Sequence, residues 1–382
     1  MAIYLSFKEI WRNKGRFFLF SLVIALIALL VLFTAALGEG LASANKEYLE
    51  KIDADLLVFQ SDTNLSTLES RLDYLKAKRL SRLPEVSSAG AIGFSNVKLI
   101  SGTNDETTNI SFIGVEPGKP GSPFPIEGQN IAETRADTVL IDKRIQEITG
   151  AEVGDTITIK STLGTDFEYY VLTVVGITDG QQYFFQPSIF VSLNTWDKYR
   201  PKQSLTQGSS QPVTNVIAIK LTDPSKAEEM KTLLPTLVDD IELADIKTAY
   251  ESAPGYAAQQ GTLNTIKVFT FLIGALVIGG FFQIQTLQKV PQIGMLKAIG
   301  LDNPTVAIAS LTQIILVSVI GIFIGTLATY LLTIGIPSGV PILLSGDAVM
   351  IAIVSLMLIG PIGGMVSVQL AIKIEPLKAL GM

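Results

Sequence analysis

The chain has 382 residues and a formal net charge of −6 at pH 7, with 48% hydrophobic and 17% charged residues. It contains neither Cys nor His, which excludes disulfides and thiolate metal sites and removes the most common general base and metal ligand. Length alone would allow roughly two or three soluble domains. The clustering of the apolar residues argues instead for a membrane protein.

Four uncharged runs organise the chain: residues 17–38, 268–288, 303–346 and 348–372. A bilayer core takes about 20 apolar helical residues, so the third run is about twice too long for one helix. Pro337 and Pro341 interrupt it, and we expect a span over 305–336, a short loop and a further span. The first run exceeds the roughly 7–15 apolar residues of a signal peptide, which favours a retained span over a cleaved leader.

Basic residues predict the orientation, because short cytoplasmic loops favour Lys and Arg. They lie before the first span, between the second and third, and after the last: Lys8, Arg12, Lys14, Arg16, Lys289, Lys297, Lys373 and Lys378. These segments carry a net +5, which leaves −11 for the rest of the chain. We therefore predict a multi-pass protein of the cell membrane with both termini in the cytoplasm and the large block 39–264 outside.

The outer block is predicted to mix helices and strands. Period-two apolar patterns indicate seven strands, within 53–60, 109–116, 137–142, 155–160, 169–178, 188–193 and 215–221. Leu65, Leu68, Leu72 and Leu75 recur at helical spacing, and Asp223-Pro224 opens a helix over 226–237. The expected fold is a membrane α-helical protein with four transmembrane helices and a large extracytoplasmic α+β domain inserted between helices 1 and 2. The predicted parts are 1–38, 39–264 and 265–382.

The first span is predicted to continue beyond the bilayer as a stalk. Its apolar phase is extended by Leu37, Leu41, Ala44, Tyr48 and Ile52. A helix over 17–52 would be roughly 54 Å long, against ~30 Å for the bilayer core. The alternative is a span that ends at Gly38, followed by a separate short helix.

The N-terminal segment reads as an amphipathic helix in the membrane interface. Ile3, Phe7 and Ile10 share one face, and Lys8 and Glu9 lie away from it. It is either a simple positive anchor or a helix that transmits force.

The loop between the second and third spans has the pattern of a helix over 291–300. Pro291 suits a first turn, and Ile293, Leu296 and Ile299 recur every three residues, with Met295 alongside. Gly300 would end the helix and Asn303 would cap the next one. So short a helix needs packing partners. It is either an interfacial re-entry turn or a surface for a cytoplasmic partner.

Residues 292–300, "QIGMLKAIG", resemble the corresponding loop of FtsX-like permeases, the MacB-type subunits of ABC transporters. The opening "LSFKEIWRNKGRF", the tail "AIKIEPLKALG" and the order of spans are also similar to that family. One departure is Gln292, where the family usually has Glu.

The resemblance implies a permease subunit that uses ATP hydrolysis by a separate subunit to drive efflux or extracytoplasmic conformational work. The loop helix would be the coupling helix to that ATPase, formed by Gln292, Ile293, Gly294, Met295, Leu296, Lys297, Ala298, Ile299 and Gly300. Expected partners are two ATPase copies, a second copy of this chain, membrane lipid and a candidate extracytoplasmic adaptor, but no nucleic acid. An alternative is an FtsX-like signal transmitter that activates an outer partner without transport.

The chain itself is not expected to be an enzyme. Its only Gly-Lys pair, Gly118-Lys119, is followed by Pro120 and does not form a GxxxxGK[ST] phosphate loop. ATP and Mg²⁺ are therefore expected on the partner, and no catalytic residue, metal ligand or bound cofactor is assigned to this chain. A membrane-anchored enzyme is disfavoured because His, Cys and any nucleophile motif are missing. The uncharged spans argue against an ion-coupled carrier.

The segment "AYESAPGYAAQQGTL" before the second span is similar to the haem-exporting branch of the family. Haem is therefore a candidate substrate. Glu251 and Tyr256 flank a Pro-Gly turn there, and their oxygens could ligate ferric haem. The alternative is a structural turn at the base of the stalk.

Overall fold

The computed structural model describes residues 8, 11–101, 106–132, 137–202, 213–300, 302–336 and 342–373. The chain divides into two compact units: a bundle unit, Met1–Leu41 with Gln259–Met382, and an inserted unit, Ala42–Ala258. The boundaries predicted at 38/39 and 264/265 refer to the membrane surface and stay predictions.

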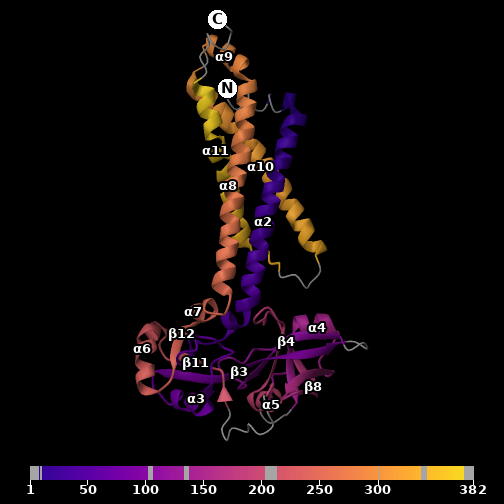
Figure 1. The fold of residues 1–382 in the computed structure, drawn as a ribbon, viewed down its shortest axis with the longest axis vertical. Coiled ribbons are helices and arrows are strands. Elements are labelled where there is room, and N and C mark those ends of the chain that lie inside the picture. Colours follow the sequence, from indigo (N-terminus) through magenta and orange to yellow (C-terminus); the bar gives the residue numbers. More distant parts are fainter. Residues whose placement is uncertain are drawn as a thin grey trace. The chain divides into compact units, whose positions relative to one another are not determined.

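Four long helices build the bundle unit (Figure 1): α2 (Lys14–Lys51), α8 (Tyr256–Gln288), α10 (Asn303–Gly335) and α11 (Gly346–Lys373). Each is long and apolar enough to cross a membrane. The four predicted spans are thus confirmed among the described residues. A short helix, α9 (Val290–Ala298), joins α8 to α10.

Close backbone contacts hold the bundle together. A Cβ at Gly325 of α10 would lie 2.6 Å from the Ala25 carbonyl oxygen of α2, and a Cβ at Gly279 of α8 would lie 2.5 Å from the Gly363 oxygen of α11. Small residues allow such approaches between membrane helices. We call these two close contacts the α2–α10 seam and the α8–α11 seam. The bundle also has an apolar core that includes Ile24, Ala28, Leu32, Phe282, Ile314, Val317, Leu356 and Ile359.

Helix α2 runs without a break for 38 residues, or about 57 Å. The prediction of one continuous helix over 17–52 is confirmed to within a few residues, and the alternative of a break at Gly38 is wrong. The last turns of α2 belong to the inserted unit, where Tyr48 and Leu49 are buried.

The inserted unit is built on a ten-stranded sheet with the order β12-β1-β11-β3-β4-β9-β6-β8-β5, and β7 pairs with β3 and β8. Its strands are β1 (Leu56–Phe59), β3 (Val86–Ser101), β4 (Glu106–Val115), β5 (Glu127–Gly128), β6 (Thr138–Asp142), β7 (Thr156–Leu163), β8 (Asp166–Thr178), β9 (Ser188–Ser192), β11 (Val216–Leu221) and β12 (Glu242–Asp245). β2 (Leu72–Asp73) and β10 (Val213–Thr214) form a separate pair.

Alternating side chains give this sheet two buried faces. Leu56 and Val58 point to one core, together with α3 (Tyr74–Leu80), α4 (Lys143–Thr149), α5 (Leu193–Tyr199) and α6 (Ala227–Leu237). Leu57 and Phe59 point to the other, which contains the end of α2 and α7 (Ile246–Glu251). There the Tyr48 hydroxyl donates a 2.8 Å hydrogen bond to the Gly121 carbonyl oxygen.

Most predicted elements of the inserted unit are confirmed. All seven predicted strands are present, and a 3₁₀ turn, η1 (Pro224–Lys226), leads into α6 with Asp223 as its cap. The helix predicted on Leu65, Leu68, Leu72 and Leu75 is wrong. Leu65 has φ of 56°, and Leu72 of β2 pairs with Thr214 of β10. Hydrogen bonds between Ser70 and Asn215 hold this segment in place.

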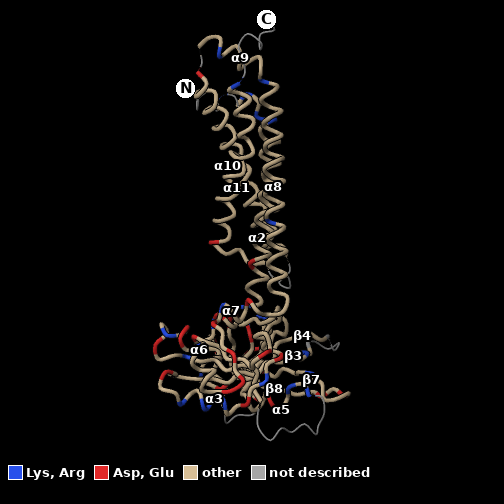
Figure 2. The backbone as a smooth tube through the Cα atoms, turned by 60° about the vertical axis from the view of Figure 1, so that its left-hand side comes forward, with Lys and Arg blue, Asp and Glu red and all other residues tan. Residues whose placement is uncertain are grey.

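The predicted N-terminal amphipathic helix falls largely outside the described residues, which include only Lys8 before position 11. Lys378 of the predicted tail also lies outside them. In Figure 2 the bundle helices are tan over most of their length, and Lys and Arg gather at the end of the bundle that carries α9.

Candidate functional site

Helix α9 begins and ends where its sequence directs. Pro291 lies in its first turn, where a missing N–H costs nothing. At the other end the Ile299 and Gly300 amides donate to the carbonyls of Met295 and Lys297, and Gly300 has φ of 105°. The predicted helix over 291–300 is therefore present as 290–298 plus its cap. The predicted cap of the next helix is wrong by one residue: Asp302, not Asn303, precedes α10, and it accepts from the Thr305 hydroxyl.

Three large apolar side chains of α9 and its C-cap are exposed in the bundle unit. Ile299 is 80% exposed, Met295 55% and Leu296 39%. Gly294 is buried and Ile293 is half-buried, so that side of the helix faces the bundle. Exposed apolar side chains outside the membrane-spanning helices suit contact with a partner protein or with the membrane surface.

Hydrogen bonds connect α9 and its entrance to the neighbouring helices. The Lys297 ammonium donates to the Ile372 carbonyl oxygen near the end of α11, at 2.6 Å. Burial lowers the pKa of Lys297 from its usual value. Just before α9, Lys289 donates to Gln313 of α10 at 3.3 Å and lies 5.5 Å from the ring centre of Phe17 in α2. The Arg16 side chain donates to Gln288. A displacement of α9 would therefore alter contacts with α2, α10 and α11.

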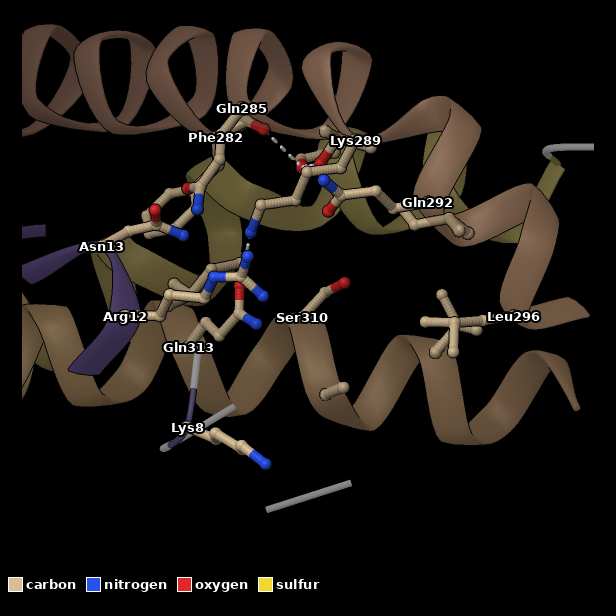
Figure 3. Close-up of a pocket in the computed structure, with 16 residues that line it drawn as sticks. Lys8, Arg12, Asn13, Phe282, Gln285, Lys289, Gln292, Leu296, Ser310 and Gln313 are labelled. Carbon is tan, nitrogen blue, oxygen red and sulfur yellow. Dashed lines mark hydrogen bonds between the residues drawn. The ribbon is translucent and has the colours of Figure 1, made fainter. Parts of the chain in front are cut away.

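A cavity of about 460 Å³ lies beside α9 (Figure 3). Its polar lining comes from Lys8, Arg12, Asn13, Gln285, Thr286, Lys289, Gln292, Ser310, Gln313 and Ser367, and its apolar lining includes Phe282, Ile293, Leu296, Val306 and Ile314. This cavity could not be predicted from the sequence, because its walls come from five separate segments of the chain.

A second cavity of about 390 Å³ lies between α2, α8 and α11. Glu39, Lys267 and Asp347 contribute charge, and apolar side chains such as Val31, Phe271 and Ile351 form much of its wall. The sequence did hold a signal for it, since each of these three charged residues directly flanks an uncharged run.

The predicted haem ligands lie in the inserted unit. Glu251 ends α7, where its carboxylate lies 3.9 Å from the Lys247 ammonium. Tyr256 begins α8, and its ring centre is 5.8 Å from that of Tyr250. The expected turn between them is present, with Gly255 at φ of 84°. Their role as haem ligands stays a prediction.

Two protein families match most of the chain between them. The MacB-like periplasmic core domain matches residues 17–237, and the FtsX-like permease C-terminal domain matches residues 264–376. The chain belongs to the FtsX-like permeases of the MacB type. Across its full length, the permease is 26% identical to proteins from Staphylococcus haemolyticus and Staphylococcus epidermidis that are named hemin transport system permease protein HrtB, covering 99% of each chain.

Two solved structures that are similar to the permease are of regions outside the membrane. The periplasmic region of MacB from Actinobacillus actinomycetemcomitans aligns with a TM-score of 0.37 and 15% identity over 54% of this chain and 95% of its own. The extracellular domain of the noncanonic ABC-type transporter YknZ from Gram-positive bacteria aligns with a TM-score of 0.35 and 13% identity, over 50% and 99%.

Family membership makes the permease a multi-pass membrane component of an ABC transporter, and such components are generally non-catalytic. The family also implies an ATPase partner. The resemblance drawn from residues 292–300 is thereby confirmed. The family does not assign a role to each residue of α9.

Proposed function

We propose that this permease exports a hydrophobic, anionic compound of the haem class, driven by a separate ATPase that docks on α9. The observation that carries the proposal is the exposed apolar surface of α9 together with its hydrogen bonds to the bundle. A partner that covers Met295 and Ile299 would remove apolar area from water, worth about 25 cal/mol per Å².

The same contacts supply a route for force. If ATPase closure displaces α9, the Lys297–Ile372 bond pulls on α11 and the Lys289–Gln313 bond pulls on α10. Both bonds use a charged donor, which makes them stronger than neutral hydrogen bonds. This arrangement supports mechanical coupling rather than simple anchoring.

The substrate class rests on the second cavity and on the names of the relatives. Haem combines a flat apolar ring, two carboxylates and a ferric iron. Lys267 could pair with a haem carboxylate, and Glu39 or Asp347 could offer an oxygen to the iron, beside walls such as Phe271 and Ile351. The volume falls in the usual range for ligand pockets, about 300–1,000 Å³. The HrtB proteins are named for hemin transport.

The proposal includes an orientation of the permease in the membrane and a number of copies in the transporter. The basic residues around α9 favour a cytoplasmic position for this end, as the positive-inside rule expects. Four spans enclose little space, so we infer two copies of the permease with two ATPase subunits, in the two-fold arrangement common among oligomers.

A transport assay in proteoliposomes tests the proposal. The permease is reconstituted with its ATPase, and hemin delivery to an external acceptor is followed by absorbance. Ile299→Asp should reduce ATPase binding and hemin transfer at least tenfold, because it places a charge on the docking surface. Leu237→Asp makes the same kind of change at a leucine that is 55% exposed in the inserted unit, and should transport normally. Full transport by Ile299→Asp would contradict docking on α9.

Signal transmission without transport is the second candidate. It is favoured by α2, an unbroken helix whose last turns are buried in the core of the inserted unit at Tyr48 and Leu49. ATP-dependent changes in the inserted unit, measured by hydrogen exchange, without any hemin transfer would support this candidate and contradict export.

A further inference from the structure

The cavity beside α9 has the charge of an anion site. Lys8, Arg12 and Lys289 line it, and no Asp or Glu is among the described residues that do so. Two of these cations come from different segments of the chain (Figure 3). Lys289 follows α8 and donates to Gln313, and Arg12 lies near the start of the chain. A ligand that carries a negative group would therefore meet positive charge from two separate segments of the chain.

One buried polar atom in this cavity calls for a hydrogen-bond donor. Gln285 of α8 is only 3% exposed, and its side-chain oxygen has no hydrogen-bond partner among the described residues. Leaving a buried acceptor unsatisfied costs about 1–3 kcal/mol. An occupant of the cavity would need a hydroxyl or an N–H to satisfy Gln285 as well as an anion to satisfy Arg12.

The rest of the lining is apolar and belongs to the membrane helices. Phe282 and Ile314, which are buried in the bundle core, form part of the wall. The wall therefore suits a ligand with an apolar portion beside its polar head. Both the apolar and the polar lining belong to the bundle unit, so the site needs nothing from the inserted unit.

We propose that this cavity binds a hydroxyl-bearing phosphate group, as in the glycerol phosphate head of phosphatidylglycerol, and that the bound group steadies α9. The phosphate would lie against Arg12 and Lys289, and a head-group hydroxyl would donate to Gln285. Because Gln292 and Ile293 of α9 line the same cavity, an occupant would bridge α9 to α8 and α10. The binding itself does not rest on the proposed export function. Only the functional consequence of steadying α9 rests on the proposed function, because that proposal makes α9 the docking helix.

Native mass spectrometry on the full-length permease without ATPase tests the binding. Wild type should retain phosphatidylglycerol at least fivefold better than phosphatidylcholine of the same chains. Arg12→Gln and Gln285→Leu should bring that preference below twofold, by removing the charge and the acceptor. Gln283→Leu is the matched control: it makes the same change two residues away on α8, at an exposed position, and should keep the preference.

A second variant guards against misfolding at the buried position. Gln285→Glu keeps the size of the side chain but adds a negative charge, so it should also lose the preference while eluting as a folded protein. Variants that fold and still prefer phosphatidylglycerol fivefold would overturn the proposal. So would a wild type without preference.

Free glycerol phosphate separates the two sources of this chemistry. If millimolar glycerol phosphate displaces the lipid in wild type but not in Gln285→Leu, the site is supported as one that accepts either source. Hydrogen exchange of the α9 amides, compared between nanodiscs of phosphatidylglycerol and of phosphatidylcholine, should be at least threefold slower with the former. Equal exchange rates would overturn the steadying of α9. These measurements use no ATPase and no hemin, so their failure is distinct from failure of the export proposal.

Discussion

The Lys297 ammonium lies 2.6 Å from the Ile372 carbonyl oxygen, which joins the last turn of α9 to the last turn of α11. Hydrogen bonds with a charged partner contribute about 1.5–3 kcal/mol. Lys297→Met keeps the length of the side chain and removes the donor. We expect normal membrane insertion but several-fold less hemin transferred per ATP hydrolysed, measured in proteoliposomes. Lys373→Met, one residue beyond Ile372 and exposed, is the control and should leave that ratio unchanged.

The α2–α10 seam should not tolerate a methyl group. Gly325→Ala would bring a Cβ within 2.6 Å of the Ala25 oxygen and the Ala28 Cβ, so the helices must separate. Overpacking of this kind costs about 1–3 kcal/mol. The thermal unfolding midpoint in detergent should fall by several degrees. Gly280→Ala is the control, because nothing lies within 4 Å of its new methyl group. It should hold or raise the midpoint, and an equal loss in both variants would contradict the seam.

Asp142 predicts a pH dependence of the inserted unit. Burial raises its pKa to about 6, helped by the charges of Glu47 and Asp179, although the amides of Arg144 and Gln181 donate to it and oppose the shift. The folded state therefore holds this proton more tightly than the unfolded chain does. Its contribution to stability is present at low pH and is lost as pH rises through about 6. Between pH 7.5 and 5.5 we expect a gain of about 1 kcal/mol.

Hydrogen exchange of the β6 and α4 amides in the full-length permease measures this gain. Protection should rise on acidification after correction for the intrinsic exchange rate. In Asp142→Asn the rise should vanish, while Lys143→Gln, at the exposed neighbouring position, should retain it. A wild type whose protection falls between pH 7.5 and 5.5 would show the opposite sign and contradict the assignment.

Two alternative haem sites can be separated by mutation. Glu39→Gln with Asp347→Asn should lower hemin affinity at least tenfold, because the second cavity would lose both anionic oxygens. Glu251→Ala with Tyr256→Phe should have little effect, since Glu251 already pairs with Lys247 at the surface. Hemin absorbance titrations measure both. The reverse ranking would return the site to the turn predicted from the sequence.

Local patterns in the sequence carried most of the fold. Uncharged runs predicted the spans, period-two apolar patterns predicted seven strands, and the unbroken apolar phase of α2 predicted its length. Two elements of the inserted unit were not predicted correctly. The 16-residue strand β3 was not predicted, because its Ser, Ala and Gly residues blur the alternation that a strand shows. The Leu65–Leu75 spacing predicted a helix, but side-chain hydrogen bonds from Ser70 and Asn215 prevail there.

Part of the candidate site could be predicted from the sequence and part could not. Helix α9 is one contiguous segment with its own start and stop, so sequence analysis located it. Both cavities join residues that are far apart in the chain, such as Arg12 with Gln285 and Glu39 with Asp347. No spacing rule brings such residues together before the packing of the helices is known.

The contact between Gly279 and Gly363 also constrains how this chain can change over generations. Most tight contacts can be repaired, because a larger side chain on one helix is offset by a smaller one opposite. Here neither residue has a side chain left to shorten, and a Cβ on either would meet main-chain oxygen at 2.5 Å. Suppressors of a substitution at Gly279 should therefore arise elsewhere along α8 and α11, where they reposition a whole helix. Descendants of this chain can depart from this pair of glycines only by moving the two helices together.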